Sequence, residues 1–271
     1  MKHYSYSELK EYLHKKNNLL DRKAEFAVSK HLDTCRNCWL EWNKARWNAA
    51  KKKQGLIELR EYLGVSFKWY LDSSWALAEE WNKRNRDKIR EIEEFYKETK
   101  NYLYNLTIWH ESGDRYPYIK DFDKIDKNYN IKSFVDFGCG IGSDGIAVLE
   151  RNKKVYFYDF QSPSTDFLKW RGRKRKKKIN LLYVNKVKSF PKVEMIWSID
   201  VLEHMVNPLD VFRAFSDRTR FFVHESKFGD KNEGRHPFHF DFNINILNRE
   251  LIKRGFTLRN NFSKLNFWTR E

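Results

Sequence analysis

The sequence has few cysteines and no long apolar segment. Only three of its 271 residues are cysteine, too few for the disulfide framework of a small secreted domain. No stretch approaches the ~18 consecutive apolar residues that a membrane-spanning helix needs. The first residues, Met-Lys-His-Tyr-Ser-Tyr, lack the apolar core of a signal peptide. We therefore expect a cytoplasmic protein of one or two domains, without a membrane span.

A glycine-rich segment follows an apolar run in the second half of the chain. The run from Phe134 to Phe137 leads into Gly138-Cys139-Gly140-Ile141-Gly142, and a helix-like apolar pattern follows. A strand that ends in such a loop lets backbone approach a ligand closely, where a Cβ would obstruct it. Asp136 could accept hydrogen bonds from that ligand's amine or hydroxyl groups. The pattern predicts a site for an adenosine-containing cofactor.

Two cofactors fit this loop. The spacing Gly140-x-Gly142-x-x-Gly145 satisfies the dinucleotide fingerprint, which would indicate NAD or FAD. The earlier pair Gly138-x-Gly140, two residues after Asp136, instead resembles the first motif of class I S-adenosylmethionine (SAM) methyltransferases. A dehydrogenase would also need a separate substrate domain, for which little chain remains.

Three later segments resemble the same methyltransferases and favour SAM. Residues 155–159, Val-Tyr-Phe-Tyr-Asp, resemble a second strand that ends in the acid for the ribose hydroxyls. Residues 195–204 contain the fourth-strand pattern D-x-L-E-H. The segment His236-Pro-Phe-His239-Phe, followed by Gly255-Phe256, is similar to the end of ubiquinone-biosynthesis-type methyltransferases.

The resemblance implies an α/β fold, a Rossmann-like seven-stranded sheet with helices on both faces. Further strands are expected at residues 180–184, 220–224, 256–259 and 264–270. Asn185 stands where the family commonly has an acid near the adenine ring, and it can still hydrogen-bond that ring. The cofactor-binding residues that the resemblance implies are Asp136, Gly138, Cys139, Gly140, Asp159, Phe160, Asn185, Asp200 and Val201.

A second motif, His31-x-x-x-Cys35-x-x-Cys38, lies near the start of the chain. On a helix this spacing places all three side chains on one face, where they could supply most of a tetrahedral zinc site. The segment resembles the zinc-binding domain of anti-sigma factors. That resemblance implies a fourth ligand near the N-terminus, for which His3 is the candidate and His14 a substitute. Four protein ligands would make the zinc structural, because they leave no open position for water.

Two other interpretations of this motif stay open: a helix with incidental buried cysteines, and a redox C-x-x-C pair. Nothing around Cys35 suggests the thioredoxin-like unit that a redox pair usually occupies. The predicted organisation is an all-α zinc-binding module at residues 1–48, a helical connector with an active-site lid at 49–130, and the SAM-binding domain at 131–271. Tyr104, Trp109 and His110 are candidates to line the pocket from the lid, although aromatic residues at helical spacing are usually packing contacts.

Methyl transfer needs an aligned nucleophile and, for a hydroxyl or protonated amine, a general base. Histidine suits that role, and the candidates around the ends of the expected fourth and fifth strands are His204, His224, His236 and His239, with Glu225. We expect His239 first and His236 second, with His204 closer to the cofactor as a wall residue. Glu203, His204 and Glu225 could alternatively bind a divalent ion.

The identity of the methyl acceptor is constrained mainly by two motifs that the sequence lacks and by its net charge. The chain lacks the N/D-P-P-Y sequence of amino-group methyltransferases acting on adenine or glutamine, and the Pro-Cys nucleophile of cytosine C5 enzymes. Its net charge is +16, and residues 171–178 hold seven cations, a run that either faces water or contacts phosphates. We expect oxygen or nitrogen methylation of a small molecule, anionic or carrier-bound. RNA methylation through residues 171–178, docking to an acidic carrier protein, and a non-catalytic regulatory role are the alternatives.

Overall fold

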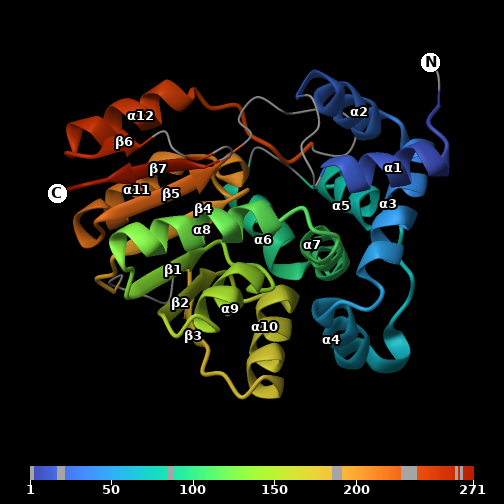
Figure 1. The fold of residues 1–271 in the computed structure, drawn as a ribbon, viewed down its shortest axis with the longest axis horizontal. Helices are drawn as coiled ribbons and strands as arrows, with labels where there is room; N and C mark the ends of the chain where they lie inside the picture. Colours follow the sequence, from blue (N-terminus) through green and yellow to red (C-terminus); the bar gives the residue numbers. More distant parts are fainter. Residues whose placement is uncertain are drawn as a thin grey trace. The chain divides into compact units, whose positions relative to one another are not determined.

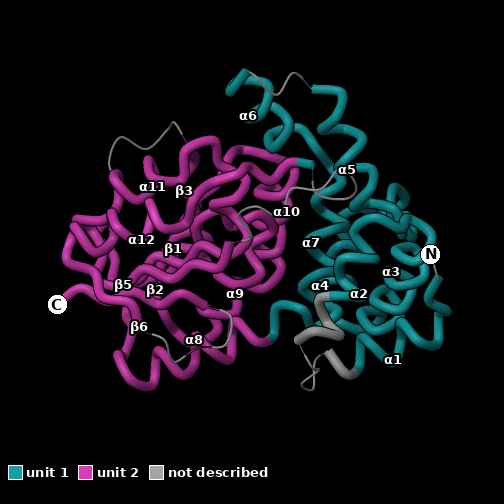
Figure 2. Tube along the Cα trace, turned by 90° about the horizontal axis from the view of Figure 1, so that it is seen from above, with its two compact units in different colours: residues 1–116, 232–237 teal, residues 117–231, 238–271 magenta. Residues whose placement is uncertain are grey.

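The computed structural model describes residues 3–16, 22–84, 88–184, 191–226, 237–259, 262 and 265–271. The chain divides into two compact units, Met1–Tyr116 with Asn232–Pro237, and Pro117–Lys231 with Phe238–Glu271 (Figure 2). This division falls between Tyr116 and Pro117, whereas the expected boundaries lie at 48/49 and 130/131. The three-part organisation therefore stays a prediction.

The described part of the first unit is helical. Its elements are α1 (Tyr6–Lys16), α2 (Arg22–Thr34), α3 (Arg36–Ala50), α4 (Gln54–Leu63), the 3-10 helix η1 (Gly64–Ser66), α5 (Ser73–Asn82), α6 (Ile89–Glu98) and α7 (Asn101–Glu111). Apolar side chains from α1, α2 and α3, among them Leu9, Leu32 and Trp42, form one buried cluster. The ion pair between Arg46 and Asp114 is also buried, with 2.9 Å between Nη2 and Oδ2. Four tryptophans of this unit, Trp39, Trp42, Trp47 and Trp81, are buried, so its aromatic residues serve largely as helix-packing contacts, as their spacing predicts.

The second unit is built on a seven-stranded sheet of order β3-β2-β1-β4-β5-β7-β6 (Figure 1). The first five strands run parallel, and β7 is antiparallel to both β5 and β6. The elements are α8 (Tyr116–Tyr129), β1 (Ser133–Phe137), α9 (Ser143–Leu149), β2 (Lys154–Asp159), α10 (Pro163–Lys174), β3 (Asn180–Tyr183), β4 (Met195–Ile199), the 3-10 helices η2 (Leu202–His204) and η3 (Ser216–Arg218), α11 (Pro208–Phe215), β5 (Phe221–Glu225), α12 (Ile244–Lys253), β6 (Thr257–Arg259) and β7 (Asn266–Thr269). The expected seven-stranded α/β sheet is confirmed, with strand ends that shift by one or two residues.

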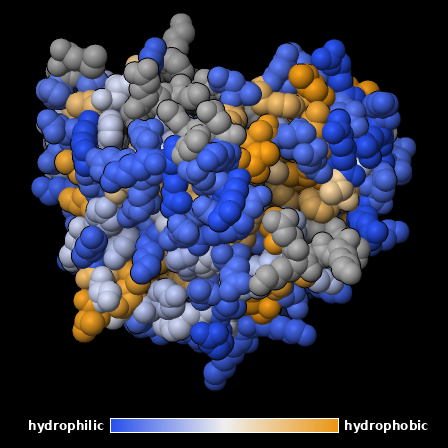
Figure 3. Space-filling model, turned by 180° about the vertical axis from the view of Figure 1, so that it is seen from behind, coloured by the Kyte–Doolittle hydropathy of each residue, from blue (hydrophilic) through white to orange (hydrophobic). Residues whose placement is uncertain are grey.

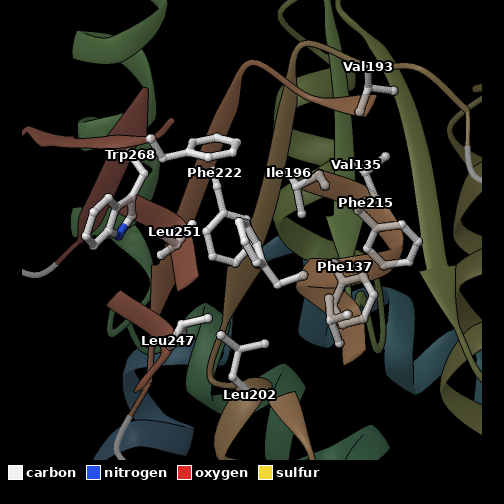
Figure 4. Packing of buried hydrophobic residues seen from close by; sticks show 13 residues of the cluster. Val135, Phe137, Val193, Ile196, Leu202, Phe215, Phe222, Leu247, Leu251 and Trp268 are labelled. Atoms are coloured by element: carbon white, nitrogen blue, oxygen red, sulfur yellow. The ribbon is translucent and has the colours of Figure 1, made fainter. Parts of the chain in front are cut away.

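Alternating residues of the central strands pack against helices on opposite faces of the sheet. Val135 and Phe222 lie in a cluster with Phe215 of α11 and Leu251 of α12 (Figure 4). On the other face, the ring of Phe134 lies 5.6 Å from that of Phe122 of α8. Because both faces are covered, the central parallel strands are apolar on both sides, as buried parallel strands usually are.

The surface is rich in charge, with 33% of all residues charged. On the face in Figure 3, hydrophilic side chains predominate and apolar ones occur singly or in small groups. Across the ranges that the structure describes, no helix combines the length and apolarity of a membrane span.

Candidate functional site

The glycine loop follows β1 directly and turns sharply. Gly138, Gly140 and Gly142 have φ of 69°, 51° and 72°, a left-handed region that L side chains rarely adopt. A Cβ at Gly138 would lie 2.5 Å from the Val201 methyl groups, and one at Gly142 would lie 2.3 Å from Leu168. Both conformation and space therefore require glycine at these two positions. The loop also contacts the turn after β4, because Val201 follows that strand by two residues.

Two predicted acids flank this loop and have different surroundings. Asp136, only 4% exposed, accepts a hydrogen bond of 2.9 Å from the Gly145 N–H at the start of α9. Asp159, at the end of β2, accepts bonds of 2.7 Å from the N–H groups of Gly140 and Phe160. Burial raises the pKa of Asp159 to about 6, although both bonds favour the carboxylate. Since a carboxylate has about four lone-pair positions, Asp159 retains acceptor capacity for two hydroxyl groups.

Arg171 belongs to the glycine loop. Its side chain is buried, and Nη1 donates to the Ile141 carbonyl (2.7 Å) and to the Ser143 hydroxyl (3.0 Å). The expectation that Arg171 contacts phosphates as part of the basic run is thus wrong. Its guanidinium is buried and donates its hydrogen bonds within the protein. Arg175 also has a partner, an ion pair of 2.7 Å with Glu150. The exposed cations of the run are Arg173, Lys174, Lys176, Lys177 and Lys178.

The segment after β4 brings two predicted histidines together. Asp200 has φ of 51°, and its N–H donates to the Glu225 carbonyl at 2.9 Å. The chain then enters η2, which carries Glu203 and His204. The ring of His239 approaches that of His204 edge-on, with 4.8 Å between centroids.

A backbone hydrogen bond fixes this approach. The N–H of Phe240 donates to the Glu203 carbonyl at 2.7 Å, so the loop at 238–242 is held against η2. One side-chain ligand atom each from Glu203, His204 and His239 lies within 4.8 Å of the others. In the described structure Glu225 is not part of this group, so the alternative ion site through Glu225 is corrected to one through His239.

The remaining predicted residues are placed as follows. His236 and Asn185 lie outside the described residues. His224 is buried within β5, and burial lowers its pKa to about 4, which makes it a weak base. Cys139 is buried, and burial raises the pKa of its thiol. Tyr104 packs against Phe67 and Tyr70 within the first unit, and its role in a lid stays a prediction, as do those of Trp109 and His110.

The predicted zinc ligands converge in the first unit. Ligand atoms of His3, His31, Cys35 and Cys38 all lie within 4.8 Å of one another. His3 Nδ1 is 3.4 Å from Cys38 Sγ and 3.3 Å from Cys35 Sγ. Around a tetrahedral zinc with ordinary bond lengths, nitrogen and sulfur ligands stand ~3.5 Å apart. The donor set and its spacing therefore fit zinc. Because His3 is in place as the fourth donor, the substitute ligand His14 is not required.

The expected single helix through these ligands is wrong. Helix α2 ends at Thr34, Cys35 has extended backbone with φ −110° and ψ 97°, and α3 begins at Arg36. The break turns Cys35 toward His3. The N–H of Tyr4 also donates to Cys38 Sγ at 3.3 Å, as backbone N–H groups commonly do around ligating sulfur atoms.

Comparison with known proteins gives a likeness of structure only. No protein-family model matches the chain, and no curated protein sequence matches it. An O-methyltransferase family protein from Burkholderia thailandensis superposes with a TM-score of 0.52 at 9% identity, covering 74% of this chain and 71% of that one.

Two further solved structures are less similar in TM-score. Magnesium protoporphyrin IX methyltransferase from Synechocystis, solved with bound SAM, gives 0.47 at 13% identity, covering 76% of this chain and 100% of that one. A SAM-dependent methyltransferase from Clostridium acetobutylicum gives 0.46 at 10% identity, with 55% and 89% covered. The first of the three likenesses, together with the strand order, shows that this chain has the Rossmann-like fold of SAM-dependent methyltransferases.

Proposed function

We propose that this protein is a SAM-dependent methyltransferase that acts on an oxygen or nitrogen atom of a small molecule. One observation carries the proposal: three glycines with positive φ form a corner whose Gly140 N–H meets Asp159 at the end of the neighbouring strand. Open parallel sheets bind nucleotides at such a corner, beyond the carboxyl ends of their strands. The nearby aspartate suits a ribose with two free hydroxyl groups.

The residues at this corner fit SAM in charge and in shape. When bound, the cofactor supplies a methyl group on a positively charged sulfur, which is already electrophilic. Asp159 would accept hydrogen bonds from the ribose hydroxyls, and the loop from Gly138 to Gly140 would let backbone lie against the nucleoside. Val201 would form part of the opposite wall, because a Cβ at Gly138 would lie 2.5 Å from its methyl groups, and Asp200 directly precedes it. Excluding water and aligning the acceptor are then the main tasks left to the protein.

Calorimetry with S-adenosylhomocysteine, the demethylated cofactor, tests this proposal. The wild-type protein should bind it and should not bind NADH. Gly138→Ala should abolish binding, because the new Cβ meets Val201 at 2.5 Å. The matched control is Gly64→Ala, since Gly64 also has positive φ but no atom within 4 Å of a built Cβ. Binding of NADH without S-adenosylhomocysteine would refute the assignment.

We further propose that His3, His31, Cys35 and Cys38 hold a structural zinc ion. The convergence of two imidazoles and two thiols supports it, and Cys38 also packs in the apolar cluster of α1, α2 and α3. Metal analysis should return about one tightly held zinc, and binding energy of this kind is folding energy. The double variant Cys35→Ser/Cys38→Ser should lose the zinc and the helicity of this segment. A metal-free wild-type protein with intact helices would overturn this assignment.

RNA methylation is the second candidate function. Five cations of the basic run are exposed in the last turn of α10 and directly after it, namely Arg173, Lys174, Lys176, Lys177 and Lys178. Such a group can release counterions from a phosphate backbone. An acidic carrier protein would bind to the same five cations, through its carboxylate groups and not through phosphates. If the protein binds S-adenosylhomocysteine but methylates neither small molecules nor RNA, the non-catalytic regulatory role is the interpretation that remains.

A further inference from the structure

We propose that Glu203, His204 and His239 bind one divalent transition-metal ion that holds the hydroxyl group of the methyl acceptor. The inference rests on the proposed methyl-transfer function and narrows its substrate to an oxygen acceptor. Its starting point is the convergence of one carboxylate and two imidazoles, with ligand atoms within 4.8 Å of one another.

These three side chains are held in place by the backbone. Glu203 and His204 lie in the short 3-10 helix η2, closed by the hydrogen bond from the His204 N–H to the Val201 carbonyl at 3.0 Å. His239 is brought in by the bond between the Phe240 N–H and the Glu203 carbonyl. Glu203 is fully buried and His239 is 6% exposed, while His204 is partly exposed. The group is therefore preorganised, with one side that solvent or a ligand can reach.

The chemistry of the donors points to a class of ion. Magnesium and calcium prefer shells made of oxygen, and two imidazoles disfavour them. A site of two histidines and one carboxylate suits zinc, manganese or iron. Three protein ligands leave coordination positions open for water or substrate. This incomplete set contrasts with the four-ligand group of the first unit, which would close around its metal.

The position of the group relative to the glycine corner gives the ion its role. Val201 touches the Gly138 position, and η2 begins at the next residue. An acceptor held at this group would therefore lie beside the predicted cofactor corner, within the same unit. Direct binding to a divalent ion lowers the pKa of a hydroxyl strongly, as it does for water.

The resulting reaction is balanced without another reagent. The acceptor hydroxyl loses its proton to water, and its oxygen attacks the methyl carbon. The carbon–sulfur bond breaks, and its electron pair stays on sulfur, leaving a thioether and a methyl ether. On this account His239 is a metal ligand, so the proton acceptor predicted there from the sequence is not required.

Electron paramagnetic resonance with added Mn²⁺ tests the site without a known acceptor. Protein stripped with a chelator and reloaded with zinc at the tight site should remove about one equivalent of free Mn²⁺ from solution. Glu203→Gln, His204→Gln and His239→Gln should each weaken Mn²⁺ binding at least tenfold. His204 is partly exposed, so its replacement is the one least able to disturb the fold. The matched control is Asp210→Asn, an exposed carboxylate in the first turn of α11. Cys35→Ser/Cys38→Ser should also retain Mn²⁺.

Calorimetry on the same samples separates this inference from the proposed function. If S-adenosylhomocysteine binds but neither Mn²⁺ nor a second equivalent of Zn²⁺ does, or if all three variants bind Mn²⁺ like the wild type, the metal site is refuted and the methyltransferase proposal stands. If Mn²⁺ binds but S-adenosylhomocysteine does not, the role in methyl transfer is refuted. Both ligands binding to the wild type, with Mn²⁺ alone lost in the variants, supports the inference.

Discussion

Cofactor binding should weaken at acidic pH because Asp159 becomes protonated. Burial raises the pKa of this side chain to about 6 in the cofactor-free protein, and the ribose hydroxyls of a nucleoside donate hydrogen bonds to a carboxylate. The ionised form is therefore the competent one. If protonated Asp159 does not bind, the apparent dissociation constant grows by about tenfold between pH 7 and pH 5, since each pH unit below the pKa removes about nine-tenths of the carboxylate.

Calorimetric titration of S-adenosylhomocysteine from pH 7.5 to pH 5 measures this effect directly. Asp159→Asn provides the control, because the amide retains the shape of the side chain but cannot titrate. Its affinity should be low and nearly independent of pH over this range. A wild-type affinity that does not change with pH, or an Asp159→Asn protein with the same slope as the wild type, would contradict the assignment of Asp159 to the ribose.

Three further predictions concern individual side chains. Arg171→Met should weaken S-adenosylhomocysteine binding measurably in calorimetry, because it removes two hydrogen bonds worth ~1.5–3 kcal/mol each from the glycine loop; Arg173→Met, at an exposed position, should leave the affinity unchanged. Asp114→Asn should lower the free energy of unfolding by ~3–5 kcal/mol in urea titrations, because it leaves Arg46 buried without its ion-pair partner; a loss below 1 kcal/mol would show that water reaches the pair. If RNA is the substrate, replacing Lys176, Lys177 and Lys178 with glutamine should reduce the slope of log affinity against log salt by ~2–3, and an unchanged slope would exclude this surface.

The sequence predicts the sheet well because its strongest signals are local. The glycine spacing after Phe137 and the acid that ends β2 are read within a few residues, and each falls where the structure has a strand end. The pattern from Asp200 to His204 also occurs at the end of β4. These features follow from backbone geometry, which short motifs encode directly.

The errors involve contacts between residues far apart in the chain. Seven cations lie between residues 171 and 178, and nothing local distinguishes Arg171, which is buried against Ile141. His239 is brought to Glu203 by the hydrogen bond from the neighbouring Phe240 N–H to the Glu203 carbonyl, across more than thirty residues. Helical spacing placed Cys35 on a continuous helix, but its backbone is extended. All three features, the burial of Arg171, the position of His239 and the backbone of Cys35, depend on tertiary contacts. Local sequence propensity does not predict such contacts.

The position of β7 has a consequence for how this unit is made. The strand lies between β5 and β6, both of which precede it in the chain. During synthesis β6 has no edge to pair with until residues 266–269 have emerged, and the indole of Trp268 fills the gap beside Phe222 only at that stage. The parallel strands from β1 to β5 can associate earlier, so a nascent chain would expose the open edge of β5 to solvent and to chaperones.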